Sequence, residues 1–185
     1  MMNNEYRSLV LAAGEKFRLI PYDVSFSESL FEAVEESRDE LLRWTSWCSA
    51  EYTMEDSRRW LQSRERYRFE SRAYDFAVTD AKTGELVGGC GIECIERKNR
   101  IGRLYYWVRN SRRREGAASE AAQAVAAFGL NNLQLIRLEA IVSENNFVGQ
   151  RVAEKIGASR EIRLRNRVIL SGKIHHAYLF ALFPE

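Results

Sequence analysis

Hydrophobic and polar residues alternate at the start of the chain and then change to a helical spacing. Residues 16–22 (KFRLIPY) have the alternation of a strand, and Pro21 favours its end. Ser25 and Glu28 have the spacing of a capping box, so a helix should begin there. The apolar side of this helix is formed by Leu30, Phe31 and Val34.

Two more helical segments follow before the pattern changes. Residues 40–47 carry apolar side chains at helical spacing, namely Leu41, Leu42, Trp44 and Trp47. Thr53 is a suitable cap for a third helix that runs through Leu61. Glu55 and Asp56 would lie in its first turn, where negative charge stabilises the positive end of the helix dipole.

From residue 74 onward the alternation becomes that of β-strands. Residues 74–80, 85–96 and 101–109 are rich in β-forming residues. A tight turn at 81–84 and a polar turn at 97–100 separate them. Such short connections predict an antiparallel meander.

The remainder of the chain alternates helices with strands. An alanine-rich helix at 116–130 is followed by a compact buried strand at 137–142 and by a helix at 147–156, which ends before Gly157. Two final strands, joined by a turn at 171–172, are predicted at 159–166 and 173–183.

This order of elements predicts one α/β (α+β) domain over residues 1–185. Its sheet should be mixed but largely antiparallel, with about seven strands, helices on both faces and a parallel step near the fifth strand. A length of 185 residues suits a single core. We expect residues 1–15 to form a peripheral N-terminal extension.

The composition is that of an ordinary globular protein, with 45% apolar and 29% charged residues. The net charge of +2 is too small to gather nucleic acid. The apolar run near residues 9–13 is far shorter than the roughly 20 residues that span a membrane. We therefore expect a cytoplasmic protein without a membrane partner. Cys48, Cys90 and Cys94 form no CxxC pair, which predicts buried, reduced thiols.

The most informative stretch is residues 106–121, where a strand leads through a polar turn into a helix of small residues. The first N–H groups of a helix lack intrahelical partners and can bind an anion such as a pyrophosphate. Gly116, Ala117 and Ala118 would leave room for it, and Arg112, Arg113 and Arg114 would add mobile positive charge. Two other interpretations stay open: a solvated basic turn before a closely packed helix, and an RNA-contacting patch.

This stretch resembles the acetyl-CoA signature of GNAT enzymes, Q/R-x-x-G-x-G/A, with Arg113, Gly116 and Ala118 at the defined positions. From about residue 16 to the end, other segments are similar, in the same order, to the ribosomal-protein N-acetyltransferases of the RimJ/RimL type. They are LIPYD (19–23), WxxW (44–47), TMED (53–56), YDFAV (74–78), TGELVGGCGI (83–92), YWV (106–108), RLEA (137–140) and RVAEKIGA (151–158).

The resemblance implies a sheet that splays between its fourth strand, ending at Val108, and its fifth, ending at Val142. The pantetheine arm of acetyl-CoA would lie in that gap, paired with the backbone like an added strand. The cofactor-binding residues it implies are Trp107, Val108, Arg109, Arg113, Arg114, Glu115, Gly116, Ala117, Ala118, Ser119, Asn146 and Arg151. For Arg151, a surface salt bridge is an equally good interpretation.

The sequence departs from the family pattern at three positions. Arg114 stands where the family often has glycine, which adds a bulky cation to the phosphate turn. Arg103 replaces a carboxylate of the fourth strand, and Gly149 replaces a serine whose hydroxyl helps some relatives protonate the departing thiolate. Cofactor binding is therefore predicted more firmly than a catalytic acid or base.

Transfer of an acyl group from a thioester to an amine needs a neutral amine, a stabilised oxyanion and protonation of the coenzyme A sulfur. The resemblance suggests a backbone N–H near Val108 as oxyanion donor, and Glu93 is the candidate base. Glu93 could instead be an exposed strand carboxylate. Trp44 and Trp47 could form an aromatic wall for the acceptor or pack in the core. No metal site is expected.

The sequence thus predicts an N-acetyltransferase that moves an acetyl group from acetyl-CoA to a primary amine. The acceptor could be a protein N-terminus or a small amine, and the enzyme could be a monomer or a homodimer. Nucleic acid is expected only through a ribosomal substrate. Two alternatives remain, a coenzyme A-binding protein without turnover and a module that binds RNA or the ribosome.

Overall fold

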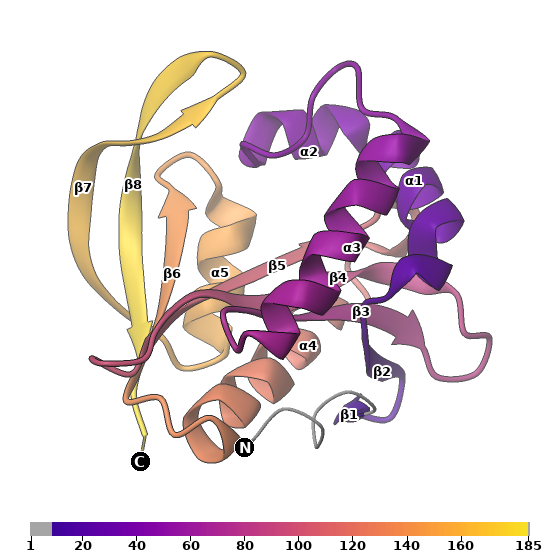
Figure 1. Cartoon of the computed structure of the whole chain (residues 1–185). Coiled ribbons are helices and arrows are strands. Elements are labelled where there is room, and N and C mark those ends of the chain that lie inside the picture. Colours follow the sequence, from indigo (N-terminus) through magenta and orange to yellow (C-terminus); the bar gives the residue numbers. More distant parts are fainter. Residues whose placement is uncertain (1–8, 185) are drawn as a thin grey trace.

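The computed structural model describes residues 9–184, which form a single sheet with helices on both faces (Figure 1). In the described residues the sheet has eight strands, in the order β1-β2-β3-β4-β5-β6-β8-β7. The strands are β1 (Leu11–Ala13), β2 (Phe17–Pro21), β3 (Tyr74–Asp80), β4 (Leu86–Glu96), β5 (Ile101–Val108), β6 (Arg137–Ser143), β7 (Ser159–Leu170) and β8 (Lys173–Leu182). The strand beyond the expected seven is β1, which pairs with β2 at the sheet edge. Part of the expected N-terminal extension therefore belongs to the sheet.

Five α-helices lie within the described residues: α1 (Ser27–Glu36), α2 (Arg38–Trp44), α3 (Met54–Phe69), α4 (Ala117–Ala127) and α5 (Phe147–Lys155). α4 packs on one face of the sheet through alanine and valine side chains, while α1 and α3 cover the other face (Figure 1). The small side chains of α4 allow a close approach to the strands. None of the helices in residues 9–184 has both the length and the apolar composition needed to cross a membrane.

The helix starts confirm one prediction and correct another. Thr53 and Asp56 form the capping box of α3, because each side chain accepts a hydrogen bond from the other residue's backbone N–H. The expected box from Ser25 to Glu28 does not form. Asp23 accepts the Ser25 N–H at 2.8 Å instead, so the segment begins as a short 3₁₀ turn before α1.

The parallel step lies between β5 and β6, as the sequence predicts. These strands pair only at their beginnings, from Ile101 opposite Arg137 to Arg103 opposite Glu139. Beyond Arg103, β5 stays paired with β4 as far as Val108, and β6 stays paired with β8. The facing edges of β5 and β6 therefore separate and leave the V-shaped gap that the resemblance implies.

The cysteines differ from the expectation at one position. Cys48 and Cys90 are buried, but Cys94 is exposed. The register between β4 and β5 shifts between Glu93 and Glu96, and Cys94 has a positive φ of 51°. This bulge interrupts the alternation that would have placed Cys94 on the same face as Cys90.

Candidate active site

Two cavities meet at the C-terminal half of β5. The first, called here the α4 cavity, has a volume of about 340 Å³ and lies between the starts of α4 and α5 and the end of α2. The second, the α3 cavity, has a volume of about 500 Å³ and is lined by α3, the loop after α2 and strands β3 to β5. Thr45, Tyr106 and Trp107 line both, so the two spaces adjoin there.

The α4 cavity includes the first turn of α4. Arg114 and Gly116 have positive φ angles of 67° and 91°, which turn the chain from the end of β5 into the helix. Gly116 is the N-cap residue and provides no side-chain cap, so the first N–H groups of the helix are available to an anion. Gly116, Ala117 and Ala118 line the cavity and present nothing larger than a methyl group.

Arg112 is held by three carboxylates and is not the mobile cation that the sequence suggested. Its Nη2 lies 2.7 Å from Asp80 Oδ2 and 3.0 Å from Glu115 Oε2, and its Nη1 lies 2.7 Å from Glu85 Oε2. The Arg112 guanidinium holds the pKa of the Asp80 carboxyl well below its usual range. Arg112 therefore fixes the turn before α4, and Glu115 faces it without lining the α4 cavity.

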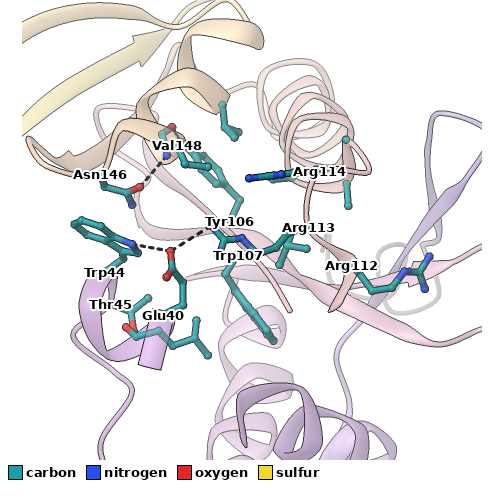
Figure 2. Close-up of a pocket in the computed structure, with 17 residues that line it drawn as sticks. Glu40, Trp44, Thr45, Tyr106, Trp107, Arg112, Arg113, Arg114, Asn146 and Val148 are labelled. Carbon is teal, nitrogen blue, oxygen red and sulfur yellow. Dashed lines mark hydrogen bonds and ion pairs between the residues drawn. The ribbon is translucent and has the colours of Figure 1, made fainter. Parts of the chain in front are cut away.

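Arg113 and Arg114 line the α4 cavity and provide its positive charge (Figure 2). Arg113 Nη2 lies 3.4 Å from Glu40 Oε1, and the same oxygen accepts a hydrogen bond of 2.9 Å from the Trp44 indole. Glu40 thus connects α2 to the arginine turn. A bound phosphate would compete with this carboxylate for Arg113.

Three other predicted cofactor residues do not line the α4 cavity. The Arg109 guanidinium donates to Glu36 on α1 at 2.8 Å. The Ser119 hydroxyl donates to the Gly116 carbonyl at 2.9 Å and so stabilises the start of the helix. Arg151 is exposed on α5. The side chains of Arg109 and Ser119 therefore stabilise elements around the cavity, and that of Arg151 lies outside it. A role for these residues in binding the cofactor remains a prediction.

The start of α5 closes the gap between β5 and β6. Asn146 caps α5 by accepting the Gly149 N–H at 2.9 Å, and the Tyr106 hydroxyl donates to the Gly149 carbonyl at 2.7 Å. A Cβ atom at Gly149 would lie 2.9 Å from Asn146 Nδ2. The serine found in the family at this position would therefore require Asn146 to move.

The two tryptophans expected at the acceptor line different cavities, and neither is a fully buried core residue. Trp44 is half-buried and lines the α4 cavity. Trp47 is 45% exposed and lines the α3 cavity, where its ring contacts those of Tyr52 and Trp107 edge-on, with centroids 6.1 Å apart in each case.

Glu93 lines the α3 cavity, as a base would have to. Its side chain is 36% exposed, and Oε1 lies 3.8 Å from Nη1 of Arg103 on β5. Arg103 is the residue that replaces the family carboxylate, so the departure in β5 places a cation opposite the candidate base. Its role as a base remains a prediction.

The structure adds a carboxylate that the sequence analysis did not single out. Asp75 on β3 is 1% exposed and lines the α3 cavity. The Tyr105 hydroxyl donates to its Oδ1 at 2.8 Å, and Arg64 Nη1 lies 3.8 Å from its Oδ2. Burial raises the pKa of Asp75 to about 6.

Two glycines of β4 allow aromatic side chains of β5 to reach this region. A Cβ at Gly89 would lie 2.5 Å from the Trp107 indole nitrogen, and one at Gly91 would lie 2.8 Å from Cε1 of Tyr105. Side chains at these positions would displace the rings. The segment TGELVGGCGI therefore serves the site by leaving space for Trp107 and Tyr105.

The sequence carried a signal for Asp75 but only a weak one for Glu40. Asp75 is a charged residue inside the apolar strand YDFAV, and buried charges in such positions are unusual unless they are paired or functional. Glu40 is an ordinary acidic residue in the first turn of α2, and only the fold brings it to Arg113.

A sequence profile described as "Acetyltransferase (GNAT) domain" matches residues 18–159. The chain belongs to the GNAT acetyltransferase family. This confirms the family that the motifs indicate, and the eight-stranded sheet with its parallel step has the architecture expected for a GNAT domain. The α4 cavity is lined by Arg113, Arg114, Gly116, Ala117 and Ala118, which the resemblance implies for cofactor binding, and that role remains a prediction.

The chain is also similar to individual GNAT proteins. It is 28% identical over 116 residues to the uncharacterised N-acetyltransferase p20 of Bacillus licheniformis, a match that spans 63% of this chain and 65% of p20. RimL, a ribosomal L7/L12 alpha-N-protein acetyltransferase in complex with coenzyme A, has a TM-score of 0.89, with 18% identity over 95% of this chain and 98% of its own. The ribosomal-protein-S5-alanine acetyltransferase of Vibrio fischeri has a TM-score of 0.87, with 17% identity over 95% and 97% of the two chains.

Proposed function

We propose that this protein is an N-acetyltransferase that transfers an acetyl group from acetyl-CoA to a primary amine. The observation that carries the proposal is that two cavities adjoin at the C-terminal half of β5, where Thr45, Tyr106 and Trp107 line both. One contains an uncapped helix start with arginines, and the other contains buried and half-buried carboxylates. Such an arrangement can hold an anionic co-substrate on one side and a cationic amine on the other.

The residues of the α4 cavity fit acetyl-CoA as a co-substrate. The first turn of α4 and the side chains of Arg113 and Arg114 would bind its phosphates. The free edge of β5 near Trp107 and Val108 would pair with the amides of the pantetheine arm, because β6 has already diverged there. Acetyl-CoA supplies the acetyl thioester, and a backbone N–H near Val108 would stabilise the developing negative charge.

The α3 cavity fits an amine acceptor with an apolar or aromatic neighbour. Asp56, Asp75 and Glu93 oppose the single cation Arg64 among its lining residues. Trp47, Tyr52 and Trp60 add aromatic surface that would pack against the acceptor. RimL and the Vibrio fischeri protein, by their names, act on ribosomal proteins, which supports a protein N-terminus; a small amine fits the same cavity.

The RNA-binding alternative has less support than the arginine-rich sequence suggested. Of the three consecutive arginines, Arg112 is neutralised by Asp80, Glu85 and Glu115. Its charge would therefore contribute little to binding phosphate groups of RNA.

Acetyl-CoA should stabilise the folded protein. A ligand that binds only the native state raises the free energy of unfolding by about 2.7 kcal/mol at a hundredfold excess over Kd. Thermal melts with increasing acetyl-CoA measure this directly. Desulfo-coenzyme A is the control for the thioester, and adenosine is the control for the phosphates. A melting temperature that does not respond to acetyl-CoA at millimolar concentration would contradict the proposal.

Replacing Trp47 and Trp44 by alanine should impair different steps. Trp47→Ala removes a wall of the α3 cavity, so kcat/KM for the amine should fall about tenfold while the Kd of acetyl-CoA stays unchanged. Trp44→Ala frees Glu40 beside Arg113 and should weaken acetyl-CoA binding several-fold. Calorimetric titrations beside steady-state kinetics separate the two. Equal losses of both properties in both variants, with lowered melting temperatures, would mean that the two tryptophans act only in packing.

A further inference from the structure

One oxygen of the buried Asp75 carboxylate lacks a hydrogen-bond partner. Tyr105 donates to Oδ1, whereas Oδ2 accepts no hydrogen bond within residues 9–184. Oδ2 forms an ion pair with Arg64, whose Nη1 lies 3.8 Å away, a distance too long for a direct hydrogen bond. A buried carboxylate that keeps an unsatisfied oxygen costs stability, so its place beside a cavity points to a ligand that would satisfy it.

The register of the sheet fixes the position of the Asp75 carboxylate. Asp75 lies opposite Gly91 on β4, and Gly91 lies opposite Tyr105 on β5, so the three residues form one row across the sheet. A Cβ at Gly91 would lie 2.9 Å from the Tyr105 hydroxyl oxygen. The missing side chain of Gly91 therefore lets Tyr105 cross β4 and fix Oδ1, while Oδ2 stays without a hydrogen bond at the wall of the α3 cavity.

Charged and titratable groups from several neighbouring elements surround Asp75. Burial, together with the charge of Glu93 on β4, raises its pKa to about 6, and Arg64, Tyr105 and Arg68 limit this rise. Arg68 is engaged elsewhere, because its guanidinium donates to the backbone carbonyls of Tyr22 and Asp75. The buried Tyr22 and Cys90 complete the surroundings; burial raises the pKa of both.

We propose that Asp75 binds the acceptor amine through Oδ2 and accepts its proton. This inference rests on the proposed acetyltransferase function. The acceptor ammonium gives one proton to the Asp75 carboxylate. The neutral amine nitrogen then attacks the thioester carbonyl carbon, so the C–N bond forms and the C–S bond breaks. The second proton passes from nitrogen to the coenzyme A thiolate, which leaves as a thiol, and Asp75 releases its proton to solvent.

Asp75 suits this task better than Glu93 does. Glu93 is 36% exposed and faces Arg103, so water and a cation already stabilise its charge. Asp75 is buried, and its Oδ2 accepts no hydrogen bond from the described residues. Its pKa near 6 also lies closer to that of an α-amino group, about 8, than to that of a lysine side chain, about 10.4. Proton transfer to Asp75 therefore favours α-amino acceptors over lysine side chains.

The test uses four isosteric or near-isosteric variants of the full chain, one of them a control, with the best amine found for the wild type. Asp75→Asn keeps an oxygen for Tyr105 but cannot take a proton, so kcat/KM should fall by about 100-fold or more. Its Kd for acetyl-CoA should not change. Asp39→Asn, at an exposed position of α2, is the matched control and should behave as the wild type.

The pH profile of kcat/KM separates proton transfer from a structural role. In the wild type, activity should decline as the pH falls through about 6, the pKa of Asp75. Tyr105→Phe removes a hydrogen bond that lowers this pKa, so the decline should move to higher pH. Glu93→Gln removes a charge that raises it, so the decline should move to lower pH. Asp75→Asn should lack this decline.

Two failures are distinguishable. If the wild type binds no acetyl-CoA or releases no thiol with any amine, the proposed function fails. If the wild type is active but Asp75→Asn keeps both its kcat/KM and the decline near pH 6, the role of Asp75 is overturned. An active wild type whose decline is the same in Tyr105→Phe and Glu93→Gln also contradicts the inference.

Discussion

Gly116→Asp should strongly weaken acetyl-CoA binding while the protein stays folded. The substitution places a carboxylate at the helix start where the phosphates are proposed to bind, and two like charges about 4 Å apart repel by about 4 kcal/mol at a protein surface. We expect a rise in Kd of at least about 100-fold, equivalent to about 2.7 kcal/mol. Turnover at fixed acetyl-CoA concentration should fall by a similar factor. Titration calorimetry on the folded variant measures the change.

Gly116→Asn is the matched control for this prediction. Gly116 has a φ of 91°, so any side chain there is strained, and a Cβ would lie 3.2 Å from Glu120. Asparagine introduces the same bulk and the same strain without the charge. The difference in Kd between the two variants therefore isolates electrostatic repulsion. An unchanged Kd in folded Gly116→Asp would remove the start of α4 from the binding site.

The second large effect concerns the stability of Asp75→Asn as a function of pH. The folded-state pKa of Asp75 is raised to about 6, above the ordinary value of 3.8. Ionising this group therefore favours unfolding, and the stability present at pH below 3.8 is lost as the pH rises through about 6. At pH 8 the cost is about 3 kcal/mol, since one unit corresponds to about 1.36 kcal/mol. Removing the charge should recover up to that amount, and loss of the attraction to Arg64 will reduce the gain.

Urea unfolding of the wild type and Asp75→Asn at pH 8 and pH 5 tests this sign. The variant should be the more stable protein at pH 8, and the advantage should shrink at pH 5, where the wild-type carboxyl is largely protonated. A variant that is less stable at pH 8 by several kcal/mol would show that the carboxylate serves the fold. Greater stability together with lower activity would be the trade-off expected of a functional group.

The sequence predicts the architecture well because local patterns determine most of it. The meander of β3 to β5 follows from alternation and short turns, and the start of α4 follows from small residues after a strand. The missing features depend on finer geometry. β1 has only three residues, too few for a periodic signal, and the Cys94 bulge breaks an alternation that looks regular in the sequence.

The site is less predictable because its decisive contacts join distant positions. Tyr105 and Asp75 are 30 residues apart, and Arg112 and Asp80 are 32 residues apart. The three consecutive arginines therefore look equivalent in the sequence, although carboxylates fix Arg112 in the structure. Glu93 is a candidate from the sequence because it lies on a strand beside the expected site. Asp75 stands out only as a charge within an apolar strand, since nothing local indicates which face of β3 adjoins a cavity.

The proposed acetyltransferase function is tested most directly by following the acetyl group itself. The protein is incubated with acetyl-CoA that carries ¹³C in its acetyl group. Separate reactions each contain one amine: a peptide with a free N-terminus, a polyamine or an amino sugar. The proposed acetyltransferase function predicts that the label appears in an amide of at least one amine, in an amount equal to the thiol released. Gly116→Asp should lower this transfer by about the factor expected for its Kd. Saturable binding of acetyl-CoA with no label transferred to any amine would contradict the proposed function and favour a coenzyme A-binding protein without turnover.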